Sequence, residues 1–239
     1  MKKVWSLIFA LLLFALIFYF VFKEKIPQKF NMKSKKENLK ENTILLEEPK
    51  TKGSISLEEA ILKRRSHRSY KKEALGFFEI SQILWAAQGI TSPEGLRSVP
   101  SAGALYPLEI FLVVGKVEKL DAALYKYNPE NHSLSKIKDG DLRSELSIAA
   151  LGQSWVKEAP AVLVIGAVFE RTTKKYGERG IRYVYMEAGH SAQNVYLQAT
   201  ALNLGTVTVG AFDDEKVKEI LGLPENVLPL YLIPIGKLE

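Results

Sequence analysis

An uncharged run of 19 residues near the N-terminus, VWSLIFALLLFALIFYFVF at 4–22, divides the chain into two parts of different kind. As a helix the run would measure about 28 Å, close to the hydrocarbon thickness of a bilayer. Its bulky end, Phe20-Val21-Phe22, lacks the small residues of a signal-peptide cleavage site, which favours an uncleaved anchor over a removed signal. The run therefore predicts a single-pass transmembrane helix, residues 1–22, that attaches the protein to a membrane.

The next segment, residues 23–52, is rich in Lys, Glu and Asn and has no apolar periodicity, which predicts a flexible tether. Residues 1–52 contain 11 basic and 5 acidic side chains, whereas residues 53–239 contain 22 of each, so the formal charge of +6 lies entirely in the first part. A domain without a basic excess is not expected to bind nucleic acid. The lysines after the run favour a cytoplasmic domain by the positive-inside rule, but exported chains also begin with MKK, so the face of the membrane stays open.

Residues 53–239 are enough for one domain with a well-buried core, and their apolar pattern mixes the two periodicities of strands and helices. This mixture predicts an α+β fold in which a mixed sheet is flanked by helices. The capping box Ser56-Leu-Glu-Glu59 opens the first helix, which is expected to run to about Arg65. Further helices are predicted at 77–88, 141–151, 181–204 and 214–221, and strands at 109–115, in a hairpin over 124–137, and at 161–169, 206–212 and 228–236.

Several kinds of site are excluded by residue type or spacing. The chain has no cysteine, which removes disulfides, thiolate catalysis and cysteine-ligated metals. Its three histidines are far apart and lack an H-x-x-x-H spacing, so no metal site is expected. Neither G-x-G-x-x-G after a strand nor the P-loop pattern occurs, so the sequence indicates no Rossmann unit and no P-loop nucleotide site.

The stretch RRSHRSY, residues 64–70, places three guanidinium groups and a hydroxyl within five residues. Guanidinium groups form bidentate, charge-assisted hydrogen bonds with phosphate, so the stretch is suited to holding a phosphorylated ligand. Basic residues in the last turn of a helix also complement the helix dipole without binding anything. Taken alone, the stretch favours this second interpretation.

Two loops next to strands are built from small residues. Pro100-Ser-Ala-Gly103 precedes the strand at 109–115, and Val209-Gly-Ala211 follows the predicted strand that begins at 206. Such loops let the backbone lie close against a flat ligand, although ordinary loops share this composition. Gly189 lies inside the predicted helix 181–204, where glycine costs about 1 kcal/mol relative to alanine unless another backbone or a ring packs closely.

In combination these motifs resemble the nitroreductase-like flavoprotein family, and within it the SagB/ThcOx-type dehydrogenases. The resemblance covers roughly residues 55–237 and rests on R-R-S-x-R, P-S-A-G-A-x-Y-P, K-Y-G-x-R-x-x-R-Y, E-A-G-H-x-x-Q-N and V-G-A-F-D-D in this order. It implies a nitroreductase-like fold and a homodimer that binds FMN non-covalently at the subunit interface, with NAD(P)H as the reductant. The helix at 181–204 would then form the interface, with Gly189 allowing close approach.

The resemblance also implies roles for individual residues. Those expected to bind the FMN phosphate and ribityl chain are Arg64, Arg65, Ser66 and Arg68, with Lys237 as a further phosphate contact. Those expected to reach the flavin from the partner subunit are Pro100, Ser101, Ala102 and Gly103. Those expected to contact the flavin ring are Gln153, Val209, Gly210 and Ala211.

The expected activity is that of a membrane-tethered FMN-dependent oxidoreductase that passes hydride from NAD(P)H to a small organic acceptor in a ping-pong cycle. The resemblance offers a peptide azoline dehydrogenase as the alternative, with Lys175 and Tyr176 as a catalytic pair that removes a proton. Lys175 is equally well interpreted as a solvated loop lysine beside Lys174. A non-catalytic flavin-binding protein is the alternative from another class.

Overall fold

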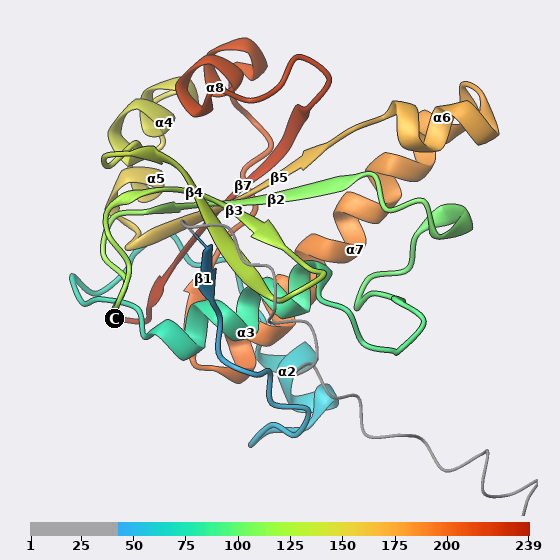
Figure 1. Cartoon of the computed structure of the whole chain (residues 1–239). Helices are drawn as coiled ribbons and strands as arrows, with labels where there is room; N and C mark the ends of the chain where they lie inside the picture. Colours follow the sequence, from blue (N-terminus) through green and yellow to red (C-terminus); the bar gives the residue numbers. More distant parts are fainter. Residues whose placement is uncertain (1–42) are drawn as a thin grey trace, which may run out of the picture. The chain divides into compact units, whose positions relative to one another are not determined.

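A computed structural model describes residues 43–239, which form a seven-stranded sheet between two layers of helices (Figure 1). The strand order is β1-β4-β3-β2-β5-β7-β6, and all neighbouring strands pair antiparallel, so the prediction of a mixed sheet was wrong in this respect. The strands are β1 (Thr43–Leu45), β2 (Leu108–Val114), β3 (Ala123–Asn128), β4 (Ser133–Asp139), β5 (Ala161–Ala167), β6 (Leu204–Thr206) and β7 (Leu228–Lys237).

Helices cover both faces of the sheet. One hydrophobic core lies between the sheet and α3 and α7, and a second lies between the opposite face and α4, α5 and α8. The helices of residues 43–239 are α2 (Leu57–Lys63), α3 (Phe77–Gln88), α4 (Arg143–Ala149), α5 (Ser154–Glu158), α6 (Glu170–Tyr176), α7 (Arg179–Ala201) and α8 (Asp214–Leu221), and η2 (Ala102–Ala104) is a 3-10 turn.

The central strand β5, AVLVIGA, explains why the two layers hold together. All seven of its residues are buried, because their side chains alternate between the two cores. Burying one large aliphatic side chain stabilises the fold by about 1.5–3 kcal/mol, so a continuous β-branched run belongs in the middle of a two-faced sheet.

Several element boundaries differ from the sequence prediction, most clearly around β6. The long helix α7 ends at Ala201 and β6 begins at Leu204, so the predicted strand 206–212 is shorter and starts earlier. After Thr206 the chain leaves the ladder, and only Val209 forms a further bridge, to Leu232. On the outer side of β6, the Thr206 carbonyl accepts from the backbone N–H of His67.

Part of the predicted tether belongs to the domain. Thr43–Leu45 pairs with β4, and the backbone of Lys50 exchanges two hydrogen bonds with the side chain of Gln82 in α3. The tether prediction was therefore wrong for residues 43–52, because Ile44 and Leu46 supply apolar side chains that pack on the core. Residues 23–42 lie outside the described part of the chain.

The prediction of a transmembrane helix in the fold and of a membrane location is corrected. Within residues 43–239, no helix combines the length and apolarity needed to cross a membrane, and the apolar run 4–22 lies outside these residues. The longest described helix, α7, has 23 residues but carries Arg179, Arg182 and Glu187. The described fold is accordingly an α+β domain without a membrane-spanning helix.

Candidate functional site

The arginine-rich stretch leaves its helix earlier than predicted and runs along the edge of the sheet. α2 ends at Lys63, and Arg64 already has an extended ψ of 122°. The backbone N–H of His67 donates to Thr206 of β6, and that of Lys71 donates to Lys237 of β7. The stretch is therefore not the last turn of a helix, and the interpretation as a helix end fits only Arg65, whose Nη1 donates to the carbonyls of Leu62 and Arg64.

Aromatic side chains lie beside the other two arginines. The Arg64 guanidinium is 5.2 Å from the centre of the Tyr196 ring, and that of Arg68 is 5.5 Å from the Trp155 ring. The Ser66 hydroxyl is 2.9 Å from the Tyr196 Oη, which also accepts from the Thr208 N–H. Burial opposes ionisation of Tyr196, but the hydrogen bonds of Ser66 and Thr208 and the charge of Arg64 outweigh it and lower the pKa of this phenol.

The loop at 209–211 adjoins this edge. Val209 is buried, whereas Gly210 and Ala211 are exposed and present their backbone to solvent. The Gln153 amide nitrogen donates to the carbonyls of Ala211 and Ala150, which fixes Gln153 beside this loop. Two residues further on, the Trp155 indole N–H is buried and has no acceptor within the described residues. Such a donor suits a polar ligand atom that the chain itself does not provide.

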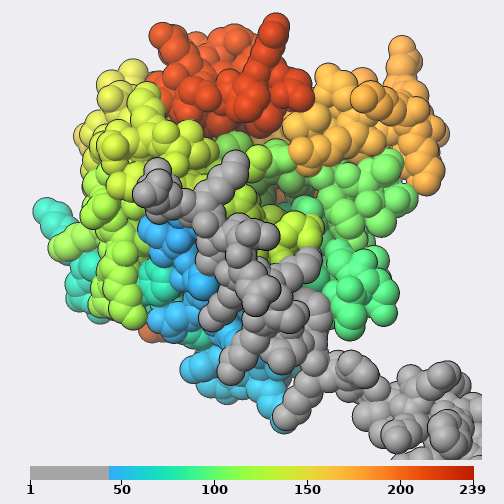
Figure 2. Space-filling view, viewed as in Figure 1, coloured from blue at the N-terminus to red at the C-terminus, as the bar shows by residue number. Residues whose placement is uncertain are grey.

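A second set of predicted residues gathers around η2. Gly103 has a φ of +63°, and a Cβ built on it would lie 2.8 Å from the Tyr176 Oη and 2.9 Å from the Lys175 Nζ. The Pro100–Gly103 loop thus packs against the end of α6, and Figure 2 shows the surface of α6 (orange) adjoining the green segment near residue 100. The structure brings Lys175 and Tyr176 to this loop, which sequence spacing alone could not show.

The two sets do not meet within one chain. Ser66 contacts α7 at Tyr196, whereas Ser101 interacts with α7 at Glu187. Nine residues of helix separate these positions, which corresponds to about 13 Å along the axis. Arg64, Ser66, Arg68, Gln153, Val209–Ala211 and Lys237 therefore form one group at the β6–β7 edge, and Pro100–Gly103, Lys175 and Tyr176 form another.

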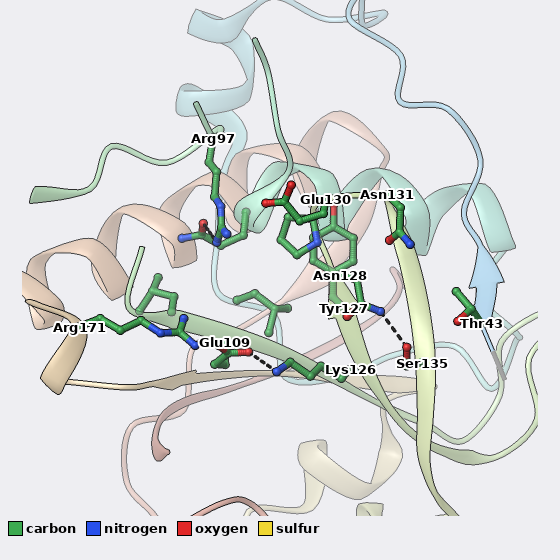
Figure 3. Close-up of a pocket in the computed structure, with 14 residues that line it drawn as sticks. Thr43, Arg97, Glu109, Lys126, Tyr127, Asn128, Glu130, Asn131, Ser135 and Arg171 are labelled. Atoms are coloured by element: carbon green, nitrogen blue, oxygen red, sulfur yellow. Dashed lines mark hydrogen bonds and ion pairs between the residues drawn. The ribbon is translucent and has the colours of Figure 1, made fainter. Parts of the chain in front are cut away.

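A cavity of about 490 Å³ lies apart from the β6–β7 edge, between β2, β3 and the end of α3 (Figure 3). Glu109 forms ion pairs there with Lys126, at 2.6 Å, and with Arg171. Burial would raise the pKa of Glu109, but these two partners outweigh it and lower the pKa. None of the residues predicted from sequence lines this cavity, although Glu109 at the start of a buried strand was a possible signal. Within residues 43–239 no cluster of three acidic or histidine side chains could hold a metal.

The fold and the arginine-lined edge define a class of protein, an α+β domain suited to a phosphate-bearing aromatic ligand. Comparison with known proteins then identifies the family: residues 61–237 match the Nitroreductase family, and the chain belongs to it.

Three relatives illustrate this membership. Methanocaldococcus jannaschii MJ1384, which is named as a nitroreductase, is 52% identical over 183 residues, or 77% of this chain and 91% of that protein. The FMN reductase [NAD(P)H] of Bacillus subtilis is 28% identical over 134 residues, or 50% of this chain and 54% of that protein. A chain of the E. coli microcin synthetase McbBCD complex with truncated pro-MccB17 bound is 26% identical with a TM-score of 0.64, covering 83% of this chain and 79% of that chain.

The family membership makes the chain an FMN-dependent oxidoreductase with NAD(P)H as its reductant. The residues at the β6–β7 edge fit this cofactor. Arg64 and Arg68 offer cationic forks for a phosphate, and Trp155 offers a buried donor without an acceptor among the described residues. The relation to the microcin synthetase chain also makes the SagB-type branch of the family plausible.

Proposed function

We propose that the chain catalyses ping-pong hydride transfer from NAD(P)H to a small organic acceptor, with FMN held at the β6–β7 edge. The observation that carries the proposal is the convergence of Arg64, Ser66 and Arg68 on Tyr196 and Trp155 at that edge. FMN, when bound, supplies the hydride chemistry. The chain supplies position and charge: Arg64 and Arg68 bind the phosphate, with Arg65 and Lys237 as further cations.

The remaining predicted contacts belong to the same proposal. Ser66 donates to the ribityl chain or phosphate, and Gln153 and the exposed backbone of Val209, Gly210 and Ala211 lie against the flavin ring. Gln153 is held for this role by its hydrogen bond to Ala211.

We further propose that two copies of the chain complete each site. Within one chain the Pro100–Gly103 loop lies away from the β6–β7 edge, so a partner subunit is needed to bring Pro100, Ser101, Ala102 and Gly103 to the same flavin. The exposed face of α7 supports this arrangement, because a Cβ at Gly189 would meet no atom within 4 Å and Met186 beside it is exposed. A second α7 could approach closely at this glycine.

Titration of the purified full chain with FMN tests the binding site. Arg68→Ala is expected to raise the FMN Kd about 10- to 100-fold, because one charge-assisted hydrogen bond contributes roughly 1.5–3 kcal/mol. Lys72→Ala removes an exposed charge two residues after this stretch and serves as the matched control, with an expected change below twofold. An Arg68→Ala protein that retains FMN as tightly as the control would overturn the assignment.

Steady-state kinetics test the reaction. With NAD(P)H and a nitroaromatic acceptor varied in turn, double-reciprocal plots are expected to be parallel, as a ping-pong cycle requires. Intersecting lines would contradict the shared binding face on which the cycle depends.

A second candidate function is peptide azoline dehydrogenation. The position of the Lys175 Nζ and Tyr176 Oη beside Gly103 favours it, because these groups then lie next to the loop that is proposed to face the flavin. Azoline oxidation removes a hydride and a proton from the substrate. The oxidised flavin, when bound, would be the acceptor of the hydride, Lys175 would accept the proton that leaves the substrate carbon, and Tyr176 would hold the substrate or the lysine in place. The similarity to a chain of the McbBCD complex supports a peptide as substrate.

Neighbouring lysines in α6 provide a matched test of this candidate. Lys175→Ala is expected to abolish azoline oxidation and Lys174→Ala to leave it within twofold, while both proteins keep their FMN. Equal azoline turnover in the two variants would remove Lys175 from the mechanism, whereas nitroaromatic reduction is expected to survive in both.

A further inference from the structure

The proposed function leaves the phenol of Tyr196 without a role of its own. Tyr196 in α7 is buried, and its Oη accepts from the Thr208 N–H at 2.9 Å. The same oxygen lies 2.9 Å from the Ser66 Oγ and 3.5 Å from the Thr208 Oγ1. Tyr196 therefore connects the backbone of the chain after β6 to a hydroxyl of the arginine-rich stretch.

The hydrogen-bonding capacity of these groups limits where each proton can go. The backbone N–H of Thr208 only donates, and the phenol has a single proton of its own. Two hydroxyl oxygens can accept that proton, and the Ser66 Oγ, at 2.9 Å, is the nearer of them. When the phenol donates to Ser66, the serine keeps its own proton for a third partner.

An anion at this edge selects that arrangement. Ser66 is exposed whereas Tyr196 is buried, so a ligand reaches the serine hydroxyl from solvent. The oxygens of a phosphate dianion only accept, so Ser66 must turn its proton to the anion and accept from the phenol. The Arg64 guanidinium lies 5.2 Å from the centre of the same phenol ring, so an anion held by Arg64 is close to Ser66.

The direction of the hydrogen bonds is then the same along the whole chain of groups. The Thr208 N–H donates to Tyr196, the phenol donates to Ser66, and the serine donates to the anion. Hydrogen bonds that run in one direction polarise one another, so the bonds behind Ser66 strengthen the one that it makes to the ligand.

We propose that Tyr196 is a positioning residue of the flavin site, which relays the Thr208 N–H to Ser66 so that the serine hydroxyl donates to the FMN phosphate. This inference rests on the proposed function, in which FMN lies at the β6–β7 edge. Of the two partners proposed there for Ser66, the phosphate is then the one that its hydroxyl meets. Tyr196 acts through the serine and needs no contact with the cofactor.

Comparison of FMN with riboflavin, which lacks the phosphate, tests this role on the full chain. Tyr196→Phe is expected to raise the FMN Kd about 5- to 20-fold and to leave the riboflavin Kd within about twofold, because the relay serves only the phosphate. Tyr70→Phe is the matched control. Tyr70 is a second buried phenol at this edge, but its Oη donates to the His67 carbonyl at 2.8 Å, so its loss should leave the ratio of the two Kd values as in the wild type. Equal losses of FMN and riboflavin affinity in Tyr196→Phe would overturn the inference.

A double variant checks that Tyr196 acts through Ser66. Tyr196→Phe/Ser66→Ala is expected to bind FMN within about twofold of Ser66→Ala, because the relay has no further effect once the serine hydroxyl is absent. Additive losses of FMN affinity would contradict the relay.

The Thr208 amide gives a separate measurement that leaves Tyr196 in place. In the wild-type protein FMN is expected to shift the proton resonance of this amide further downfield than riboflavin does, because the phosphate polarises the chain of hydrogen bonds. Ser66 is exposed, so Ser66→Ala is expected to keep the fold, and it should abolish the difference between the two ligands. The same difference in wild type and Ser66→Ala would exclude the serine from the relay.

Failure of the proposed function has a different signature. If the phosphate does not bind at this edge, Arg68→Ala also leaves the ratio of the FMN and riboflavin Kd values unchanged. If only the relay fails, Arg68→Ala weakens FMN selectively and Tyr196→Phe does not.

Discussion

Acidification is expected to loosen the attachment of residues 43–50 through one buried histidine. His132 in the β3–β4 turn is 2% exposed, with its Nε2 2.9 Å from the Glu47 carbonyl and its Nδ1 2.8 Å from the Tyr127 Oη. A carbonyl only accepts, so Nε2 carries the proton of the neutral ring and Nδ1 accepts from the Tyr127 hydroxyl. A second proton on Nδ1 would oppose that hydroxyl.

The size of the effect follows from the pKa of His132. Burial lowers this pKa from 6.5 to about 4, against a smaller opposing effect of the hydrogen bond to Glu47. The unfolded chain therefore takes up the proton first as the pH falls, and stability is lost between about pH 6.5 and pH 4. The full gap corresponds to about 3 kcal/mol, of which about 2 kcal/mol should be lost between pH 7 and pH 5.

Urea unfolding followed by circular dichroism at pH 7 and pH 5 measures this loss. His132→Gln keeps a donor and an acceptor but does not titrate. Between pH 7 and pH 5 this variant should therefore lose about 2 kcal/mol less unfolding free energy than the wild type. Gln82→Ala removes another attachment of this segment, the two hydrogen bonds with the Lys50 backbone, and leaves the contacts of the histidine in place, so it should lower stability and keep the pH dependence. The reasoning fails if wild type and His132→Gln lose the same free energy.

Two further predictions concern glycines. Gly189→Arg should keep the fold, since its Cβ meets nothing within 4 Å, but should convert the proposed dimer to a monomer in light scattering; an unchanged mass would exclude α7 from the interface. Gly103→Ala should lower azoline turnover by displacing Lys175 and Tyr176, whereas Gly95→Ala has a similarly left-handed φ of +85° in open space and should lower only stability, by about 1 kcal/mol; equal azoline turnover in the two variants would contradict the contact.

The local elements were largely predictable, because their signals are local. Ser56 caps α2 through the Glu59 N–H as the capping box requires, and α3 and α8 have the predicted bounds. The apolar runs likewise predicted the central strands, because a β-branched stretch without charges is expected to be buried. The α+β class and the family followed from these elements and from the combined motifs, whereas the fully antiparallel pairing of the sheet did not.

The outlying segments were predicted less well, because their structure depends on distant partners. Residues 43–52 are polar enough to suggest a tether, yet Gln82, Ser81 and His132 from later elements bind their backbone. Among the candidate site residues, the motifs identified Arg64, Ser66 and Arg68 but not Trp155, whose importance lies in a buried N–H without an acceptor in the described chain.

The sequence by itself determined most of the helices and strands, since these depend on near neighbours. It also determined which charged side chains are available to the candidate site, since charge depends on residue type. Only the tertiary structure decided which of those side chains meet. It placed the arginine stretch on the β6–β7 edge, set Lys175 and Tyr176 against Gly103, and kept the two groups of site residues apart on α7. Contacts between residues tens of positions apart arise from the packing of whole elements, and no local pattern encodes them.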